Sequence, residues 1–431
     1  MNKKIMPFIN IYSLFTIFYY FFGRYDWEIP SYSKLFLWII ILLVSLNMGY
    51  YFKYEFTFKK KLNNGKVIEE REDSRVLKTD YYKLFVISCL SIIIFQVIWV
   101  VTVLGEFNVI NIFESLGSNY YERLDFGKDE SALGMQIRTL FWGLTLFAYP
   151  IGFVFFNSLK LSGKILLFVT ILIDMIAALN MGISKNIGDI VIIYILSVIL
   201  KKYVHSPSKK KEETNKKKIL IVILLFLTMF GAIQQSRDET KGMSSQNQLF
   251  SNFSTVREDT FFDVMTFNNV GLVSTIDRMG VYVSHGYTGL AFSLETSFQN
   301  TYGLGFSRAL MDYARQYLGI ELMTKTYMSQ IEASYGWPNG MYWSTAYVWF
   351  ASATSFLFLP LAMFFFGYIL SKVEKRFSVY KDVYSLAFLA QLFIQMVYLP
   401  ANAQIFQSRS ALIGIITLSV IYVITGRKIR R

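Results

Sequence analysis

The chain has 431 residues, of which 54% are hydrophobic and 18% aromatic, and it carries a formal net charge of +13. Its single cysteine, Cys89, excludes an intrachain disulfide and a cysteine metal cluster. The apolar residues come in blocks of roughly 17–25, the length that a helix needs to cross a bilayer core of about 30 Å. This distribution predicts an all-α polytopic membrane protein.

The apolar blocks predict about ten transmembrane helices. In chain order they lie at about 5–23, 35–52, 84–104, 139–157, 165–181, 187–200, 219–234, 346–370, 384–400 and 410–426. Residues 1–234 hold the first seven and residues 346–431 the last three, with one large loop, residues 235–345, between them. An even number of crossings places both termini on the same side of the membrane.

The charges indicate which side that is. With the N-terminus in the cytoplasm, 29 of the 43 Lys and Arg residues fall in cytoplasmic segments, as the positive-inside rule requires. The basic runs KKKLNNGK and SKKKEETNKKK then act as topology signals beside anionic lipid, so we expect no nucleic-acid partner. Both termini are therefore predicted to be cytoplasmic, and the loop 235–345 to lie outside.

The motifs of several enzyme classes are missing from the sequence. It contains no Gly-x-x-x-x-Gly-Lys-Ser/Thr phosphate loop, no His-Glu-x-x-His and no Gly-x-Ser-x-Gly. We therefore expect no nucleotide hydrolysis, no metal site and no cofactor. The outer segments offer arginine, carboxylate and aromatic side chains, which suit a substrate that combines phosphates with sugars.

Three charged residues fall in or beside the predicted spans. Asp174 lies within the fifth span, and Asp189 follows Lys185 by four residues at the start of the sixth. Because a charge inside the bilayer is costly, each should face protein or water. Asp174 either pairs with a neighbouring helix or lines a substrate cavity or proton path. Lys185 either extends toward the membrane surface or meets a lipid phosphate there.

The first helix predicted in the large loop covers residues 281–298. Apolar and small residues occupy one side of its helical pattern, which His285 and Gly286 interrupt. This pattern is typical of an amphipathic helix that lies in the membrane interface with its apolar face down.

A second amphipathic helix is predicted at 307–318. Arg308 and Arg315 are seven residues apart and share a face, with Asp312 between them. The three residues form either an intrahelical ion-pair ladder or an arginine pair that faces an anionic substrate.

The large loop returns to the membrane through YGWPNGMYWST, in which Pro-Asn-Gly predicts a tight turn. Trp337, Tyr342 and Trp343 flank this turn. Their rings either belong to an aromatic belt at the membrane interface, or stack on sugar faces or cover a polyprenyl chain.

The sequence resembles the O-antigen polymerase family, the Wzy-type polymerases of oligosaccharide repeat units. The resemblance rests on the span layout with one dominant outer loop, and on VSHGYTGLAFSLE, TYGLGFS and GWPNGMYWSTAYVW followed by FGYIL, all within residues 275–370. Arg278 and Gly289 are separated by ten residues, which fits an Arg-x10-Gly pattern of that family. The remaining chain matches by layout alone. The family often has a second large outer loop, where this chain has only the short turn GISKNIG.

The resemblance implies a glycosyltransferase of GT-C-like architecture in the bacterial cytoplasmic (inner) membrane. Such an enzyme transfers a growing glycan from undecaprenyl pyrophosphate to a new lipid-linked repeat unit, which builds O-antigen or a related surface polysaccharide. Its partners would be these lipid-linked glycans and the membrane lipid, with a chain-length regulator and a flippase as candidate protein partners. No cofactor is implied, since the donor bond supplies the energy.

The same resemblance suggests which residues act. Arg278 is the first candidate to bind the charge that develops on the pyrophosphate, and His285 is a candidate base for the acceptor hydroxyl. Other candidate bases are Asp263, Asp277 and Glu295. The other candidate substrate-binding residues are Arg308, Arg315, Lys185, Arg237, Arg409, Trp337, Tyr342 and Trp343.

Two alternative functions stay open at this stage. An O-antigen ligase, which moves the finished glycan to lipid A-core, would share the architecture. A flippase for lipid-linked oligosaccharides would favour roughly twelve to fourteen spans, small loops and a charged central cavity. The 111-residue segment 235–345 argues against the flippase.

Overall fold

A computed structural model describes residues 5–52, 79–107, 116–120, 133–204, 209–240, 250, 252–257, 260–261 and 270–430. This part of the chain is mostly helical. Seven helices within it are long and apolar enough to cross a membrane, namely α1 (Ile5–Phe22), α2 (Tyr32–Tyr51), α3 (Thr79–Leu104), the segment Leu133–Val154, α7 (Leu161–Asn180), α15 (Thr345–Tyr380) and Arg409–Gly426 of α17 (Arg409–Arg430). The prediction of an all-α polytopic membrane protein is confirmed at this level.

The other three predicted spans coincide with helices that are not among these seven. They are α8 (Lys185–Val204), α9 (Lys209–Thr240), whose apolar part is Ile221–Arg237, and α16 (Val383–Val397). The number of ten crossings therefore stays a prediction. The basic run expected to form a loop after α8 is instead helical from residue 209 and continues into the apolar part of α9.

The fourth predicted span contains two helices. They are α5 (Leu133–Thr145) and α6 (Ala148–Val154), separated by a turn at residues 146–147. The fifth and sixth spans are confirmed as separate helices, because the chain turns at residues 181–184 between α7 and α8. Residues 121–132, which hold most of NYYERLDFGKDE, lie outside the described part.

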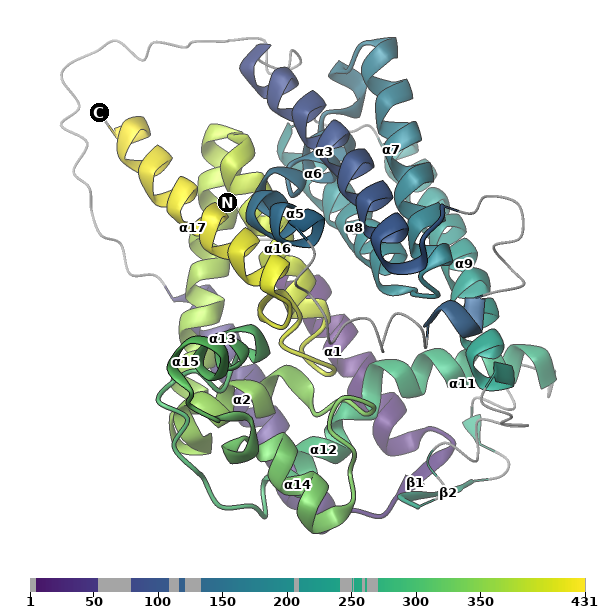
Figure 1. Ribbon diagram of the computed structural model, residues 1–431, viewed down its shortest axis with the longest axis vertical. Helices are drawn as coiled ribbons and strands as arrows, with labels where there is room; N and C mark the ends of the chain where they lie inside the picture. Colours follow the sequence, from purple (N-terminus) through teal and green to yellow (C-terminus); the bar gives the residue numbers. More distant parts are fainter. Residues whose placement is uncertain are drawn as a thin grey trace.

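The described part of the large loop forms short helices at one end of the molecule. They are α11 (Val270–Ser284), α12 (Gly286–Ser293), α13 (Arg308–Leu318) and α14 (Tyr327–Tyr335). Figure 1 shows α12 and α14 at this end, whereas α17 ends toward the opposite one. We name this end the outer end, after the topology predicted from the charges.

The helix predicted at 281–298 differs from the one observed. It is broken at His285 into α11 and α12, and every residue of α12 is buried. Because α12 packs against α2, α14 and α15, its apolar residues meet protein and not lipid. The prediction of an interfacial helix is therefore wrong for α12. The second predicted helix is confirmed as α13, with Ser307 as its N-cap and Gly319 in the left-handed conformation at its C-cap.

A two-stranded antiparallel sheet joins distant parts of the outer end. Strand β1 (Tyr25–Trp27), from the first outer loop, pairs with β2 (Ser254–Val256) of the large loop. Arg257 secures the pair, since its Nη2 lies 2.5 Å from Asp26 Oδ1 and its Nη1 donates to the Phe21 carbonyl at 3.0 Å. The two strands are only three residues long and were not predicted from the sequence.

Helices α2 and α15 cross with their backbones in direct contact. A β-carbon on Gly49 would overlap the Phe364 carbonyl oxygen, and one on Gly367 would overlap the Leu46 carbonyl oxygen. Glycine is required at both positions, because small residues are what lets membrane helices approach this closely. Trp38 packs on Phe356 farther along the same pair, with ring centroids 5.6 Å apart.

Helix α15 changes direction at Ser355, which has φ 68° and ψ 162°. The segment before this residue is buried among the outer helices, where the Ser352 carbonyl accepts from Thr301 Oγ1 at 2.6 Å. The segment after it exposes apolar side chains, among them Leu357, which is 77% exposed. The single helix α15 thus belongs to the outer core at one end and to the membrane surface along the rest.

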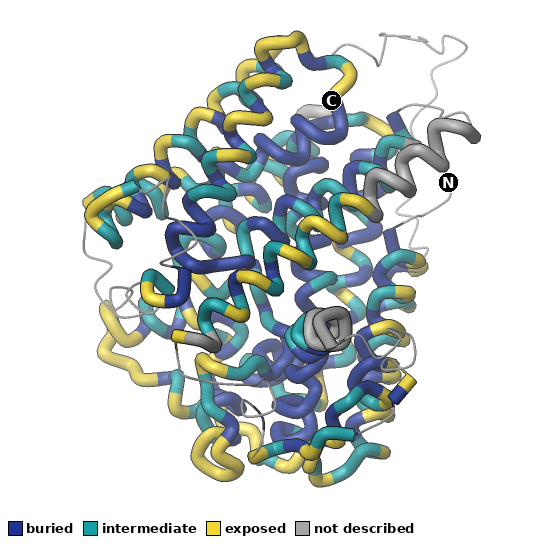
Figure 2. The backbone as a smooth tube through the Cα atoms, turned by 90° about the vertical axis from the view of Figure 1, so that its right-hand side faces the viewer, coloured by how far each residue is buried: buried dark blue, intermediate teal, exposed yellow. Residues whose placement is uncertain are grey.

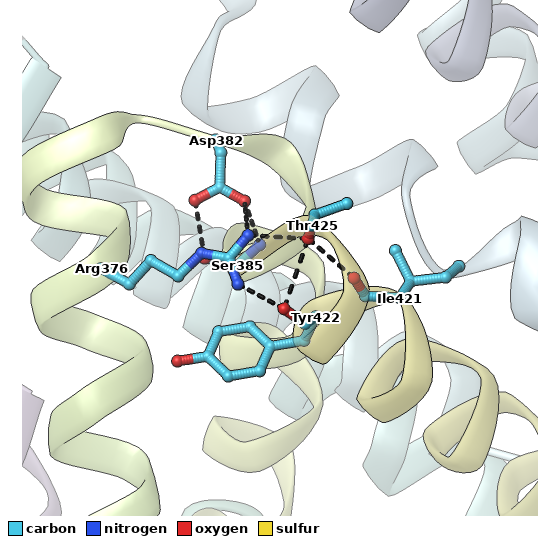
Figure 3. A network of polar contacts seen from close by, with 6 residues as sticks. All are labelled: Arg376, Asp382, Ser385, Ile421, Tyr422 and Thr425. Carbon is cyan, nitrogen blue, oxygen red and sulfur yellow. Dashed lines mark hydrogen bonds and ion pairs between the residues drawn. The ribbon is translucent and has the colours of Figure 1, made fainter. Parts of the chain in front are cut away.

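The opposite end of α15 is tied to α16 and α17 by a polar network (Figure 3). Arg376 Nη2 lies 3.2 Å from Asp382 Oδ1 and donates to Thr425 Oγ1 at 2.7 Å. The guanidinium also donates to the Tyr422 carbonyl and lies 4.4 Å from the centre of its ring. Asp382 caps α16 by accepting from the Ser385 amide at 2.9 Å and hydroxyl at 2.7 Å.

Apolar side chains remain exposed along the outsides of the long helices. Examples are Ile11 on α1 at 70%, Leu161 and Phe168 on α7 at 73% and 67%, and Leu361 on α15 at 54%. Figure 2 shows the exposed residues along the outer edges of the helices, around a buried centre. Such extensive apolar exposure is typical of helices that face lipid.

We predict that Gly367→Leu prevents the close approach of α2 and α15. A leucine side chain must displace the Leu46 backbone, and the overpacking should cost on the order of 3 kcal/mol or more. The measurement is the yield and the thermal midpoint of the purified protein. Phe365→Leu is the matched control, because Phe365 is 52% exposed and its replacement should change neither quantity. Normal folding of Gly367→Leu would contradict the observed crossing.

We predict that Asp382→Asn destabilises the fold by about 3–5 kcal/mol, because it leaves the nearly buried Arg376 without its counter-charge. The double variant Arg376→Met/Asp382→Asn should lose less than the sum of the two single losses. Thermal unfolding of all three variants measures this coupling. Additive losses would show that the two side chains do not stabilise each other.

Candidate functional site

The turn that returns the large loop to the membrane is held by an aromatic cluster. The amide of Tyr342 donates to the Pro338 carbonyl at 3.1 Å, and Gly340 has φ 95°, which confirms the predicted turn. The Trp343 ring is stacked on His285 at 5.5 Å and meets Tyr282 edge-on at 4.3 Å. The cluster therefore joins α11 to the start of α15.

Trp337 lies at the centre of this cluster and is completely buried. Its Nε1 donates to the Trp343 carbonyl at 3.2 Å. The rings of Tyr342 and Phe253 pack against it, with centroids 4.8 and 5.0 Å away. Because no ring face is open, the prediction that Trp337 stacks on a sugar is not supported, and its role is to hold the turn. Tyr342 and Trp343 are half-buried.

His285 is held at both ring nitrogens. Its Nδ1 lies 2.7 Å from the Val281 carbonyl oxygen and donates to it, so Nε2 accepts the Trp343 amide at 3.0 Å. Burial lowers the pKa of His285 to about 4. With no lone pair available and a low pKa, the neutral imidazole is a poor base for an acceptor hydroxyl. The geometry gives His285 a structural role in place of the predicted catalytic one.

Arg278 lies on α11, beside an ion pair that ties α11 to α1. Its neighbour Asp277 accepts from Arg24 Nη1 at 2.6 Å and from the Tyr19 hydroxyl at 2.8 Å. Arg278 itself is half-buried near Tyr25 of β1. Asp277 is buried and fully engaged by these donors, so it is a poor candidate base.

The two other predicted bases differ in position. Glu295 follows α12 and lies 2.9 Å from Lys34 Nζ at the start of α2. Its side chain is 33% exposed, so it is the most accessible of the described candidates. Asp263 lies outside the described residues.

Three predicted arginines lie where α13 meets α17. The start of α13 is fastened to the residues just before α17, because the Ser307 hydroxyl donates to the Phe406 carbonyl at 2.6 Å. Arg409, at the start of α17, donates to Gln316 Oε1 at 3.1 Å and lies 5.0 Å from the centre of the Tyr313 ring. Arg308 and Arg315 project from α13 itself. We name Arg308, Arg315 and Arg409 the arginine cluster.

The arginine cluster is accessible. Arg308 is exposed, and the Arg315 side chain is 65% exposed, with only a 3.8 Å contact to Asp312. Exposed apolar side chains stand at the end of the same helix, with Tyr317 at 71% and Leu318 at 70%. In Figure 1 α13 lies near α15 and far from α11, so the cluster is separate from Arg278.

A groove of about 550 Å³ runs along the outer end, between β1, the start of α2 and the ends of α12 and α14. Carboxylates and aromatic rings line it, among them Asp26, Glu28, Tyr32, Phe292 and Tyr335. The Tyr335 ring is 37% exposed and is stacked on Phe292 at 4.6 Å. This is the size range of small-ligand sites, and stacked rings with nearby acceptors suit a sugar.

Lys185 and Arg237 lie apart from these outer surfaces. Arg237 Nε donates to the Gly182 carbonyl at 2.9 Å, and its guanidinium lies 3.8 Å from the Tyr120 ring centre, so it fastens the turn between α7 and α8. Lys185 Nζ binds Asp189 Oδ2 at 2.6 Å. Asp174 lies close by and accepts from neighbouring helices, as one of its two predicted roles required.

Several residues with a part in these sites were not anticipated. Gln96, Tyr149 and Asn186 surround Asp174, and Glu28 and Tyr335 line the groove. An isolated glutamine in the apolar run of α3 was the one signal that the sequence offered for the first group. The groove depends on the pairing of β1 with β2, for which no local signal exists.

A scan of protein-family models and searches of characterised proteins and solved structures find no match to this chain. Function is therefore inferred from the residues and their geometry.

We predict that His285→Gln folds and flattens the pH dependence of stability. The folded histidine has the lowered pKa, so stability is lost as pH falls from about 6.5 toward 4, where only the unfolded chain gains the proton. That loss should reach on the order of 3 kcal/mol in the wild type and be absent in the variant, whose amide can replace both hydrogen bonds. Thermal midpoints across this pH range measure it. Equal pH profiles would contradict the buried neutral imidazole.

Proposed function

We propose that the chain is a membrane glycosyltransferase that polymerises undecaprenyl-pyrophosphate-linked repeat units at the outer face of the bacterial cytoplasmic membrane. The observation that carries the proposal is the arginine cluster, which stands beside exposed apolar side chains on α13. A polyprenyl pyrophosphate combines the two features that such a surface would bind, an anionic head and an apolar tail.

The head group fits the charges of α13. Arg308 occupies the first turn of the helix, where the positive end of the helix dipole makes a cation unfavourable. A bound phosphate would offset this repulsion, and the planar guanidinium of Arg315 can hold phosphate oxygens in pairs. Arg409 is already oriented by Gln316 and Tyr313, so little side-chain entropy is lost when it binds.

The tail fits the surroundings of the cluster. Tyr317 and Leu318 end α13 with their side chains exposed, and α17 leads from the cluster along an exposed apolar face that includes Ile416 and Val420. A polyprenyl chain could follow this face while its pyrophosphate stays at α13. This arrangement supports a lipid-linked donor more than a free nucleotide sugar, which has no apolar tail.

The glycan would occupy the outer groove. Its stacked Phe292–Tyr335 pair offers a flat apolar face, and Asp26 and Glu28 offer acceptors for sugar hydroxyls. Pyrophosphate is a good leaving group, so the reaction needs fixed cations at the departing oxygens more than a strong acid. Of the candidate bases that the structure describes, Glu295 is the most exposed.

We predict that Arg315→Ala and Arg409→Ala each lower polymerisation by on the order of 10²-fold, because each removes a donor from the departing pyrophosphate. Arg315→Lys should recover only part of the loss, because an ammonium cannot make the paired contact. The assay is elongation of lipid-linked repeat units by the purified protein in detergent, with product lengths resolved on a gel.

Lys325→Ala is the matched control, since Lys325 is a basic residue of the same outer segment that lies 5.6 Å from the Tyr302 ring. It should leave product lengths unchanged. Arg278→Ala tests the other arginine position. A loss confined to Arg278→Ala would move the pyrophosphate to α11, beside β1. Elongation in detergent without lipid A-core separates a polymerase from both a flippase and a ligase. Wild-type products from both cluster variants would rule out the proposed donor site.

A further inference from the structure

A narrow cavity of about 100 Å³ lies between the long helices, away from the arginine cluster and the groove. Its walls come from α3, α5, α6, α7, α8 and α16, and from the residues just before and at the start of α17. The charged and amide side chains that line it include Gln96, Asp174, Lys185, Asn186 and Asp189. Polar walls inside an apolar helix bundle are costly, which makes them candidates for a bound ligand.

Asp174 is held by neutral donors only. Its Oδ1 accepts from Gln96 Nε2 at 2.5 Å and from Asn186 Nδ2 at 3.1 Å, and its Oδ2 accepts from the Tyr149 hydroxyl at 2.6 Å. The carboxylate is 5% exposed. These hydrogen bonds fix its position, but none of the three donors supplies a positive charge.

Two acceptor oxygens of residues in the cavity wall, Gln96 Oε1 and Asp189 Oδ1, are buried and accept no hydrogen bond of good geometry within the described part of the chain. Gln96 is only 2% exposed, and its Oε1 is buried without a partner, because its amide nitrogen is committed to Asp174. Asp189 Oδ1 is likewise buried without a hydrogen bond of good geometry, although the Tyr398 hydroxyl lies nearby. Buried acceptors are seldom left unsatisfied, which makes these two oxygens candidate ligands of a group bound in the cavity.

The charged side chains that line the cavity indicate the charge of a ligand that would bind there. Two carboxylates, Asp174 and Asp189, face one ammonium, Lys185, which leaves one formal negative charge among the lining residues. The Arg138 guanidinium is not among the lining groups, and it lies 4.6 Å from the centre of the Trp142 ring, which lines the cavity. Carboxylate and amide oxygens are the ligands that hard cations prefer.

We propose that this cavity binds one hard monovalent cation, for which sodium serves as the probe. The amide oxygen of Gln96 and the carboxylates of Asp174 and Asp189 coordinate it, and water completes the shell. The ion bridges α3, α7 and α8, which contribute one of these three side chains each. Lys185, whose side chain is 41% exposed, shares Asp189 with it. The inference does not depend on the proposed polymerase activity.

The test uses the full-length protein in detergent. Its thermal midpoint is measured in sodium chloride and in choline chloride of equal ionic strength, and binding of radioactive sodium is measured directly. Sodium should raise the midpoint by about 2–4 °C relative to choline, because the ion binds only the folded state. Asp174→Asn and Gln96→Met should each abolish both the rise and the sodium binding.

Glu374→Gln is the matched control. Glu374 is also a fully buried carboxylate between helices, but it is held by Tyr50 and Tyr203 and does not line the cavity. This variant should keep the sodium response. Gln96→Met preserves length and volume, so it gives a result even if Asp174→Asn does not fold. The proposal is overturned if sodium neither binds nor shifts the midpoint, in which case the cavity holds water only. It is equally overturned if the response survives in Gln96→Met.

Discussion

The direct backbone contact between α2 and α15 is the constraint on which the rest of the structure depends. Gly49 and Gly367 let the two helices approach until carbonyl oxygens occupy the space of missing side chains. Once that crossing is set, the buried start of α15 can meet the outer helices. There Ser352 accepts hydrogen bonds from the Thr301 hydroxyl and the Tyr327 amide. Its other end can meet α16 and α17 through Arg376 and Asp382. One helix therefore aligns the groove and the arginine cluster with the membrane-facing surface.

The sequence was sufficient for features that depend on local pattern. Apolar length located the long helices, the helical pattern located α13 at 307–318, and Pro338 with Gly340 marked the exit turn. It was insufficient where a partner far along the chain decides the outcome. The apolar face of 286–293 reads equally well as lipid-facing or buried, and only packing against α15 makes it a core helix. Strands of three residues are too short to show a periodic pattern, so the sequence predicted neither β1 and β2 nor the groove that depends on their pairing. The number of crossings stays a prediction, since the apolar parts of α9 and α16 are short and α8 is not among the seven helices long and apolar enough to cross.

The candidate site residues fall into two groups, those whose polar atoms are engaged by the fold and those that stay exposed. His285, Trp337, Arg237 and Asp277 were selected for their chemistry, yet each spends its hydrogen bonds on neighbouring parts of the fold. Arg308 and Arg315 were selected by the same reasoning and stay largely exposed. Residue type alone does not separate the two groups, because an arginine that donates to a backbone carbonyl and an arginine that stays exposed look alike in sequence. The two groups are told apart only by the hydrogen bonds and ion pairs that each side chain makes in the folded structure.

The pairing of β1 with β2 bears on the order in which the protein is made. Arg24 and its partner Asp277 are separated by 253 positions, and the strands themselves are almost as far apart. While the ribosome adds the intervening helices, the backbone edge of β1 and the carboxylate-binding face of Arg24 stay without their final partners. The outer end can close only after the segment that follows α9 has been synthesised. A chain stalled before residue 254 thus presents an open strand edge to its surroundings.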